Sequence, residues 1–499
     1  MAKPSQGGPA AVRKSVRAKV ETRPTRQAVE TVAVVESIAP VKPAEIDTFT
    51  AAMRYLNERV NVERTSPVRV SPDAFKLDRM AALLEALDNP QRDVKCVHIA
   101  GSKGKGSTVE MTASCLTSCG YAVGVYTSPH LVDVRERIRI NNEPISYAHF
   151  AKLCQKVAVA GQNIKKQHGD PTFFEIVTAI GLCYFAEQAV DIAVVEVGLG
   201  GRLDATNLIQ PEVTAITAIQ LEHTQLLGDT LEKIAREKAG IFKPGVTALT
   251  VPQTPGVMQV FREVAATVGA PLEVLGEELD FSFRFEASPE LGPHGRVVLT
   301  TPRSNFEHLP VPLKGEHQAL NCGLALAILD KLRDRGFETP ERQVAEGLAK
   351  TPCNGRMEMA WNSPRIIVDG AHTPDSIGCL VKSIGAHVKY DSMVAIFGCA
   401  ADKDVKAMLA KLAMGADKVI FTKAAGNARA MDPRELQRKF AEVSSKMSQT
   451  AKTLPDALNL ARRAVGRDDL ICVTGSFYLV GEAKKHLADL AAKRENAGH

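Results

Sequence analysis

The sequence lacks the long apolar runs of a membrane protein, and it contains no Cys-x-x-Cys pair. Its apolar stretches are interrupted by charge or glycine, as at 190–197, where Asp191 and Glu196 break the run. A membrane-spanning helix needs about 20 consecutive apolar residues. The ten cysteines are scattered along the chain, which is typical of free thiols in a reducing compartment. We therefore expect a cytoplasmic protein without a membrane partner.

An excess of positive charge is absent from most of the chain. The formal net charge is +5, and residues 1–44 hold eight Lys or Arg against three Glu, so the rest of the chain holds 54 residues of each sign. A nucleic-acid partner for the neutral part is therefore not supported. Residues 1–45 are poor in large apolar side chains, which predicts a disordered basic tail. An Arg-rich start is also typical of an organelle transit peptide, although three Glu residues dilute that pattern.

Short β-branched runs alternate with helical patterns from about residue 94 onward, which predicts βαβ units and a mostly parallel sheet. We expect strands at 94–100, 122–127, 191–197, 213–219 and 246–251, and helices at 107–119, 172–188 and 230–239. Gly120 and Gly240 follow two of these helices, where a left-handed residue often ends a helix. A second α/β series is expected after the Pro- and Gly-containing stretch 351–355, with strands at 365–369, 393–397, 418–422 and 470–474. Residues 275–313 are expected to form a small antiparallel elaboration.

The segment at 100–108 reads AGSKGKGST and lies between a predicted strand and a predicted helix. Its small residues allow backbone N–H groups to surround phosphate oxygens, the helix N-terminus adds positive potential, and Lys105 adds a mobile charge. The segment departs from the GxxxxGK[ST] pattern, because residue 99 is Ile and Gly106 occupies the hydroxyl position. An ordinary Gly/Lys turn would have the same composition, but we favour a phosphate-binding loop.

Three polar side chains lie at the ends of successive predicted strands. Ser128 follows the second strand, Glu196 lies at the end of the third, and His223 follows the fourth. Because the carboxyl ends of parallel strands gather ligand groups, these three side chains together favour a Mg²⁺ site. Each also has an ordinary explanation on its own, as a Ser-Pro turn, an ion-pair partner or a structural histidine.

Nine motifs, in this order, resemble those of folylpolyglutamate and dihydrofolate synthases, which are members of the Mur ligase superfamily. They are GSKGKGST, TSPHL with DVRERIRIN, EVGLGGRLDATN, LEHTQLLGDT, REKAGI, GEHQALN, NGRMEM, VDGAHTPDS and TGSFYLV, within about residues 46–490. The resemblance implies an α/β fold in two domains. A mononucleotide-binding (P-loop, Mur ligase-like) domain with a mostly parallel sheet would occupy residues 46–350, and a smaller Rossmann-like glutamate ligase domain residues 351–495.

The resemblance further implies ATP-dependent ligation of L-glutamate to dihydropteroate, to folyl-(poly)glutamate or to both, through an acyl phosphate. The implied ATP contacts are Gly104, Lys105, Gly106, Ser107, Asn321, Arg356 and Asp369. The implied Mg²⁺ ligands are Ser128, Glu196 and His223. The implied catalytic residues are Lys105, Glu196, His223 and Lys238, the last as a carbamate formed with CO₂.

The acceptor is less well defined by the resemblance than the nucleotide. The residues that resemble pterin contacts of bifunctional members are Thr172, Phe173, Phe174, Glu175, Arg202, Leu203 and Asp204. Against this, Ala74, Phe75 and Lys76 replace an Asp-Leu-Gly loop that is common in bifunctional members. The alternatives are folylpolyglutamate synthesis alone or another Mur-type amide ligase. We expect a monomer that uses small-molecule substrates.

Overall fold

The computed structural model describes residues 41–63, 76–425, 427 and 429–497. Most of the predicted tail, residues 1–45, therefore lies outside the described residues, as do Ala74 and Phe75. The prediction of disorder is wrong for its described end, because Pro43–Glu45 forms a 3-10 helix in which Pro43 is buried, and the Ala44 carbonyl oxygen accepts a hydrogen bond from Gln155 Nε2 at 3.0 Å. No helix in the described ranges is long and apolar enough to cross a membrane. The α-helices are α1 Phe49–Asn57, α2 Leu77–Glu85, α3 Lys105–Ser118, α4 Tyr147–His168, α5 Phe173–Glu187, α6 Thr224–Leu227, α7 Leu231–Ala239, α8 Pro255–Val268, α9 His317–Arg333, α10 Glu341–Ala349, α11 Pro374–His387, α12 Val405–Ala413, α13 Pro433–Ala441, α14 Leu454–Ala464 and α15 Phe477–Ala497.

The strands form three sheets, and short 3-10 helices lie in the connecting segments. The strands are β1 Cys96–Ala100, β2 Val123–Tyr126, β3 Ile138–Ile140, β4 Glu143–Pro144, β5 Ile192–Glu196, β6 Val213–Ile216, β7 Thr247–Thr250, β8 Leu272–Val274, β9 Asp280–Ser288, β10 Gly292–Thr300, β11 Asn305–Pro310, β12 Glu358–Asn362, β13 Arg365–Asp369, β14 Met393–Phe397, β15 Lys418–Phe421, β16 Met447–Thr450 and β17 Leu470–Thr474. The 3-10 helices are η1 Pro43–Glu45, η4 Pro90–Arg92, η5 Val134–Arg137 and η6 Ala205–Leu208.

The first sheet has eight strands in the order β4-β3-β2-β5-β1-β6-β7-β8. The strands from β2 to β8 in this order run parallel, whereas β3 and β4 form an antiparallel edge. The register pairs Ile99 on β1 with Glu196 on β5, and Ala100 on β1 with Ile216 on β6. The carboxyl ends of β1, β5 and β6 therefore lie together, and the loops that follow them can form one site.

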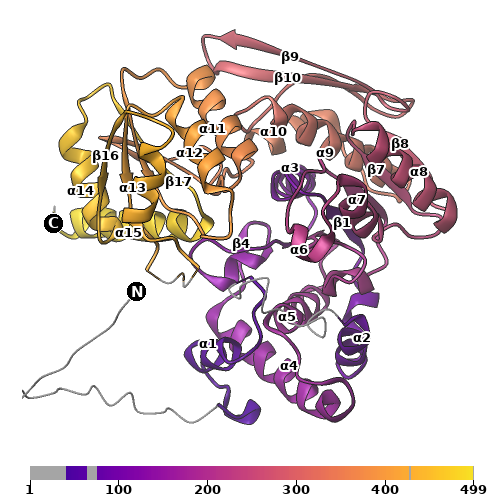
Figure 1. The fold of residues 1–499 in the computed structure, drawn as a ribbon. Coiled ribbons are helices and arrows are strands. Elements are labelled where there is room, and N and C mark those ends of the chain that lie inside the picture. The colour runs from indigo at the N-terminus through magenta and orange to yellow at the C-terminus, as the bar shows by residue number, and fades with distance from the viewer. Residues whose placement is uncertain (1–40, 64–75, 426, 428, 498–499) are drawn as a thin grey trace, which may run out of the picture. The chain divides into compact units, whose positions relative to one another are not determined.

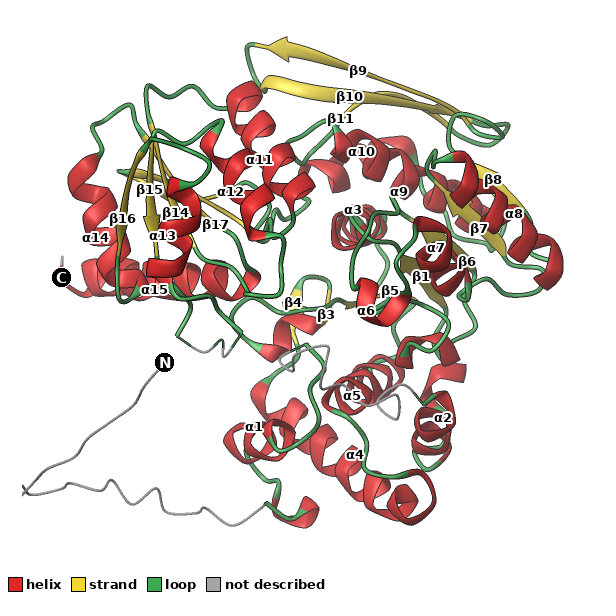
Figure 2. Cartoon of the chain, in the orientation of Figure 1, coloured by secondary structure: helices red, strands yellow, loops and turns green. Residues whose placement is uncertain are grey.

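Alternate side chains of this sheet pack against different layers of helices. Val97 and Ile99 pack with α3, α9 and α10 in one apolar core. Cys96 packs with α1, α2, α4 and α5 on the other side of β1, and Ala100 belongs to a core formed with α7 and α8. Helices thus cover both faces of the sheet (Figures 1 and 2).

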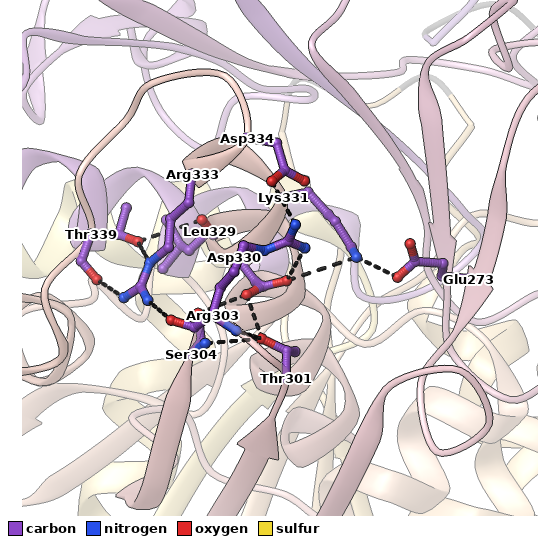
Figure 3. A network of polar contacts seen from close by, with 10 residues as sticks. All are labelled: Glu273, Thr301, Arg303, Ser304, Leu329, Asp330, Lys331, Arg333, Asp334 and Thr339. Atoms are coloured by element: carbon purple, nitrogen blue, oxygen red, sulfur yellow. Dashed lines mark hydrogen bonds and ion pairs between the residues drawn. The ribbon is translucent and has the colours of Figure 1, made fainter.

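A three-stranded antiparallel sheet, in the order β11-β10-β9, follows the first sheet in the chain. It confirms the antiparallel elaboration predicted for residues 275–313. The turn between β10 and β11 is held by Asp330 on α9, whose side chain is fully buried. The Asp330 carboxylate accepts hydrogen bonds from Thr301 Oγ1 and Ser304 Oγ, both at 2.7 Å, and from Arg303 Nη2 at 3.0 Å (Figure 3). These bonds also fix α9, the helix that carries Asn321.

The second α/β sheet has six strands in the order β12-β13-β17-β14-β15-β16. All of its strands run parallel except β12, which is an antiparallel edge. Helices α11, α12 and α13 pack in one apolar core, and α14 and α15 pack in another on the opposite face. The predicted fold class, α/β with a mostly parallel N-terminal sheet and a second α/β unit, is confirmed.

Every predicted strand and helix is present, with differences at the ends. Helix α3 begins at Lys105, two residues before the predicted start, so the loop lysine is the first helical residue. Gly120 has a left-handed φ of 96°, as predicted. The same prediction is wrong for Gly240, whose φ is −61°. Glycine fits there for another reason, because an added Cβ would lie 2.4 Å from Cβ of Arg202.

Candidate active site

A cavity of about 770 Å³ lies at the carboxyl ends of strands from both α/β sheets. The loops after β1, β2, β5 and β6 line it from the first sheet, and the loops after β13, β14 and β17 line it from the second. In parallel α/β sheets, this edge is where ligands bind. The cavity is therefore the candidate site, and each predicted residue can be placed relative to it.

The phosphate loop forms one wall of the cavity. Gly104, Lys105, Gly106 and Ser107 all line it. Gly104 is the N-cap of α3, has a left-handed φ of 101°, and provides no side-chain cap. The first N–H groups of α3 therefore remain for an anion, at the end of the helix where the dipole favours negative charge.

Lysine side chains concentrate positive charge beside this loop. Lys105 Nζ donates to the carbonyl oxygen of Gly101 at 3.0 Å. The pKa of Lys103 is lowered to about 8, mainly by burial and also by Lys105, Lys403 and Lys238, whereas Glu222 opposes this shift. Cations that repel each other in this way are stabilised by a polyanion such as a triphosphate.

Ser128, Glu196 and His223 line the same cavity. The backbone N–H of Ser128 donates to Glu196 Oε2 at 3.4 Å. Burial raises the pKa of Glu196, while Lys105 and Arg356 lower it. His223 has a left-handed φ of 47°, and burial lowers its pKa to about 4 against the opposing effect of Glu222.

This set of groups fits Mg²⁺ only in part. Among the described residues, no group of three or more His, Cys, Asp or Glu side chains is arranged to hold a metal ion. Mg²⁺ commonly binds one or two carboxylates and takes its other ligands from phosphates and water. Glu196 and the Ser128 hydroxyl, beside a phosphate loop, match that kind of site.

Lys238, on α7, lies behind the phosphate loop instead of lining the cavity. Its side chain is 2% exposed, and its Nζ donates to the Gly101 carbonyl oxygen at 2.8 Å and to Glu222 Oε1 at 2.9 Å. Burial is the strongest influence and lowers the pKa of Lys238, whereas the Glu222 carboxylate raises it. The ion pair also holds the pKa of Glu222 far below its usual range, although burial opposes this. The geometry supports a charged pair, since two buried partners lie at hydrogen-bonding distance.

Two of the three further predicted nucleotide contacts, Asn321 and Arg356, lie against the loop. A Cβ at Gly104 would lie 2.2 Å from Asn321 Oδ1, and one at Gly106 would lie 2.1 Å from Arg356 Nη2, so both side chains lie directly against the loop. Asp369 lies at the end of β13, where its carboxylate accepts N–H bonds from Met357 at 2.9 Å and from Ala371 at 2.8 Å. Burial raises the pKa of Asp369 to about 6. Of these three residues, only Arg356 lines the cavity.

Most residues of the two predicted acceptor segments line the cavity, but two do not. The cavity is lined by Thr172, Phe174, Glu175, Leu203 and Asp204. Phe173 is instead buried in the core. The Arg202 side chain is 55% exposed and forms an ion pair with Glu237 at 2.9 Å. The structure thus brings most of the two segments together, while Phe173 and Arg202 point elsewhere.

Glu175 is held by protein groups on several sides. Thr172 and Glu175 form a reciprocal capping box at the start of α5. The Glu175 carboxylate also pairs with Arg79 on α2, whose Nε lies 3.0 Å from Oε1 and 2.9 Å from Oε2. Both side chains are at most 6% exposed. This buried pair ties α2 to the segment that carries Phe174.

Sequence reasoning missed several polar residues that line the cavity, among them Lys403 and His372. His372 follows β13, and its Nδ1 donates to the Gly370 carbonyl oxygen at 2.8 Å. Lys403 lies in the loop between β14 and α12. Both follow the carboxyl end of a parallel strand, which is the signal that pointed to Ser128 in the first series.

The chain is similar to known ligases over most of its length. Residues 99–329 match the Mur ligase middle domain, and residues 355–477 match the Mur ligase glutamate ligase domain. The chain is 31% identical to the dihydrofolate synthase/folylpolyglutamate synthase of Bacillus subtilis, over 82% of this chain and 94% of that protein. It is 33% identical to a probable bifunctional folylpolyglutamate synthase/dihydropteroate synthase of Halobacterium salinarum over 81% of this chain, but it spans only 48% of that longer protein. Escherichia coli FolC, solved in complex with DHPP and ADP, is 28% identical, with a TM-score of 0.76 over 91% of this chain and 99% of FolC.

The two α/β units, with a phosphate loop at the carboxyl end of β1 in the first, define an ATP-dependent, amide-bond-forming ligase of the Mur type. The cavity is lined by the segments around Phe174 and Leu203, which resemble those of folate enzymes. The similarity to the B. subtilis protein covers most of both chains. The chain belongs to the dihydrofolate synthase/folylpolyglutamate synthase family.

Proposed function

We propose that the chain catalyses the ATP-dependent ligation of L-glutamate to dihydropteroate and to folates that already carry glutamate. The observation that carries the proposal is a single cavity lined both by the phosphate loop and by the segments around Phe174 and Leu203. Such a cavity can hold a nucleotide and an aromatic acceptor next to each other. Phosphoryl transfer between two bound molecules requires this proximity.

The chemistry proposed is acyl activation. The γ-phosphoryl group of ATP passes to the acceptor carboxylate, giving ADP and an acyl phosphate. The glutamate amine then attacks the acyl carbon, and phosphate leaves with the formation of an amide. Lys103 and Lys105 of the loop and Arg356 beside it offset charge on the phosphoryl group. The reaction requires no side-chain nucleophile.

Mg²⁺ is proposed as the metal, with Ser128 and Glu196 as its protein ligands and His223 as a third group on the same cavity wall. When bound, the ion would neutralise phosphate charge. The role of the chain is to hold Glu196 ionised despite burial, and Lys105 and Arg356 both favour the ionised form.

Lys238 is proposed to react with CO₂ to form a carbamate. Carbamate formation needs a neutral amine, and burial of Lys238 favours neutrality. The modification would replace a cation by an anion behind the phosphate loop. It would also require the ion pair with Glu222 to open, because carbamate and carboxylate repel each other.

The proposed enzyme is a cytoplasmic monomer that acts on small molecules. All ten cysteines lie within the described residues and are unpaired, which supports a reducing compartment.

The proposal is tested by glutamate-dependent ADP release from purified protein, with dihydropteroate and tetrahydrofolate assayed side by side. Turnover with both acceptors is the expected result. Turnover with tetrahydrofolate alone would restrict the function to folylpolyglutamate synthesis. No glutamate-dependent release with either acceptor would overturn the proposal.

A further inference from the structure

His98, on β1, is a buried histidine that the proposed reaction does not use. Its side chain is 0% exposed. Its Nε2 lies 2.9 Å from Thr206 Oγ1 on η6. Its Nδ1 has no hydrogen-bond partner among the residues that the structure describes. Burying a histidine with one unpaired nitrogen costs free energy. The hydrogen bond between His98 Nε2 and Thr206 therefore needs a functional or structural explanation.

Thr206 connects His98 to the cavity residue Asp204. The Thr206 hydroxyl donates to Asp204 Oδ1 at 2.5 Å, and the Thr206 backbone N–H donates to the same oxygen at 3.0 Å. A hydroxyl has a single proton. Because that proton goes to Asp204, the contact with His98 must be a donation from His98 Nε2–H to Thr206 Oγ1. Burial lowers the pKa of His98 to about 3, so the ring is neutral near pH 7 and carries its proton on Nε2.

Asp204 in turn shapes the turn that follows β5. Its Oδ2 accepts from the Leu199 backbone N–H at 2.8 Å, and the backbone N–H of Gly198 also bonds to the carboxylate. The Phe174 ring lies directly on this turn, because a Cβ at Gly198 would lie 2.4 Å from Phe174 Cζ. Gly198, Leu199, Phe174 and Asp204 all line the cavity. The orientation of one carboxylate therefore sets the wall against which the aromatic ring rests.

We propose that His98 is a positioning residue for the acceptor pocket, acting through Thr206 to orient the Asp204 carboxylate. It fixes the turn at Gly198 and thereby the Phe174 ring that faces a flat aromatic acceptor such as a pterin. Neither His98 nor Thr206 lines the cavity, so neither needs to touch substrate. This inference rests on the proposed function, because it assigns the Phe174 side of the cavity to the acceptor.

The test compares pairs of variants that differ in one hydrogen-bonding group. His98→Phe removes the Nε2 donor and keeps a planar ring, whereas His98→Gln places an amide donor at a similar reach. Thr206→Val removes the hydroxyl, and Thr206→Ser keeps it. Thr250→Val is the matched control, since Thr250 on β7 is a buried threonine of the sheet that carries His98, and its hydroxyl donates to the Ile216 carbonyl oxygen at 3.0 Å.

The readouts are the KM for dihydropteroate, the KM for ATP, the affinity for ADP and the Tm. His98→Phe and Thr206→Val should each raise the dihydropteroate KM about tenfold, the effect of one buried hydrogen bond, with little change in ATP KM or ADP affinity. His98→Gln and Thr206→Ser should restore most of the loss. The His98→Phe/Thr206→Val double variant should be no worse than either single variant, because both interrupt the same chain.

Several results would overturn the inference. One is an equal rise in both KM values; another is a lowered Tm with both KM values unchanged. Equal behaviour of His98→Gln and His98→Phe, or a similar dihydropteroate defect in Thr250→Val, would do the same. If His98→Phe does not fold, the Thr206 pair decides the matter. A wild-type protein without ligase activity would refute the proposed function instead, so the two failures are distinguishable.

Discussion

Replacement of Lys238 by Arg separates two possible roles of a buried lysine. Lys238 is 2% exposed and forms an ion pair with Glu222 at 2.9 Å. It can serve as the cation that this pair requires, or as a neutral amine that becomes a carbamate. Arg retains the cation but cannot form the carbamate, because its guanidinium stays protonated. Ala removes both functions.

The structure gives the expected size of each effect on stability. Removing one partner of a buried ion pair costs about 3–5 kcal/mol, so Lys238→Ala should lower the free energy of unfolding by that amount even if Lys238 has no role in catalysis. Lys238→Arg keeps the pair and adds volume in a packed site, which costs about 1–3 kcal/mol. Loss of stability therefore does not distinguish the two roles. Activity of the Arg variant does.

The assay is glutamate-dependent ADP release with dihydropteroate. We expect Lys238→Ala to lose at least about 100-fold in kcat, the effect of removing one group that stabilises transition-state charge. Acetate should restore part of this activity by supplying a carboxylate, and Lys238→Arg should be no better than Ala. Wild-type activity should also fall in CO₂-depleted buffer and return with bicarbonate.

Lys243→Arg is the matched control. Lys243 is partly buried, and its Nζ donates to the Asn207 carbonyl oxygen at 2.9 Å, but it does not line the cavity. Burial likewise lowers the pKa of Lys243, and the variant should keep its activity. Full activity in Lys238→Arg would refute the carbamate and show that only a cation is needed at this position.

Three further predictions test the site, the N-terminal segment and the fold. Lys105→Ala and Glu196→Ala should each abolish ligation in a folded protein, because each removes charge compensation at the phosphates without opening an apolar core; near-wild-type turnover in either variant would contradict the site assignment. A chain that begins at Val41 should keep its Tm and specific activity, since the composition of residues 1–40 predicts no packed contacts; loss of either would show that these residues contribute. Asp330→Ala should lower the free energy of unfolding in urea by about 2–4 kcal/mol, because it leaves the donors of Thr301, Ser304 and Arg303 without their acceptor (Figure 3); a change below about 1 kcal/mol would contradict that role.

Much of the site could be predicted from the sequence because the parallel sheet imposes a simple rule. Ser128, Glu196 and His223 follow or end strands whose hydrophobic patterns are clear, and parallel strands present their carboxyl ends at the same edge. The position of the phosphate loop follows from the same local pattern. Strand and helix patterns are local, so they can be recognised in the sequence without knowledge of the tertiary packing.

The sequence by itself thus determined the order of elements, the phosphate loop and the residues at the strand ends. Only the tertiary structure showed that Arg202 turns to the surface, where it meets Glu237, and that Lys403 reaches the cavity from the second sheet. It also joined His98 to Thr206, more than 100 residues apart in the chain, because the fold brings η6 within hydrogen-bonding distance of the His98 side chain. Such contacts depend on strand register and helix packing. These link residues distant in sequence, so no local pattern encodes them.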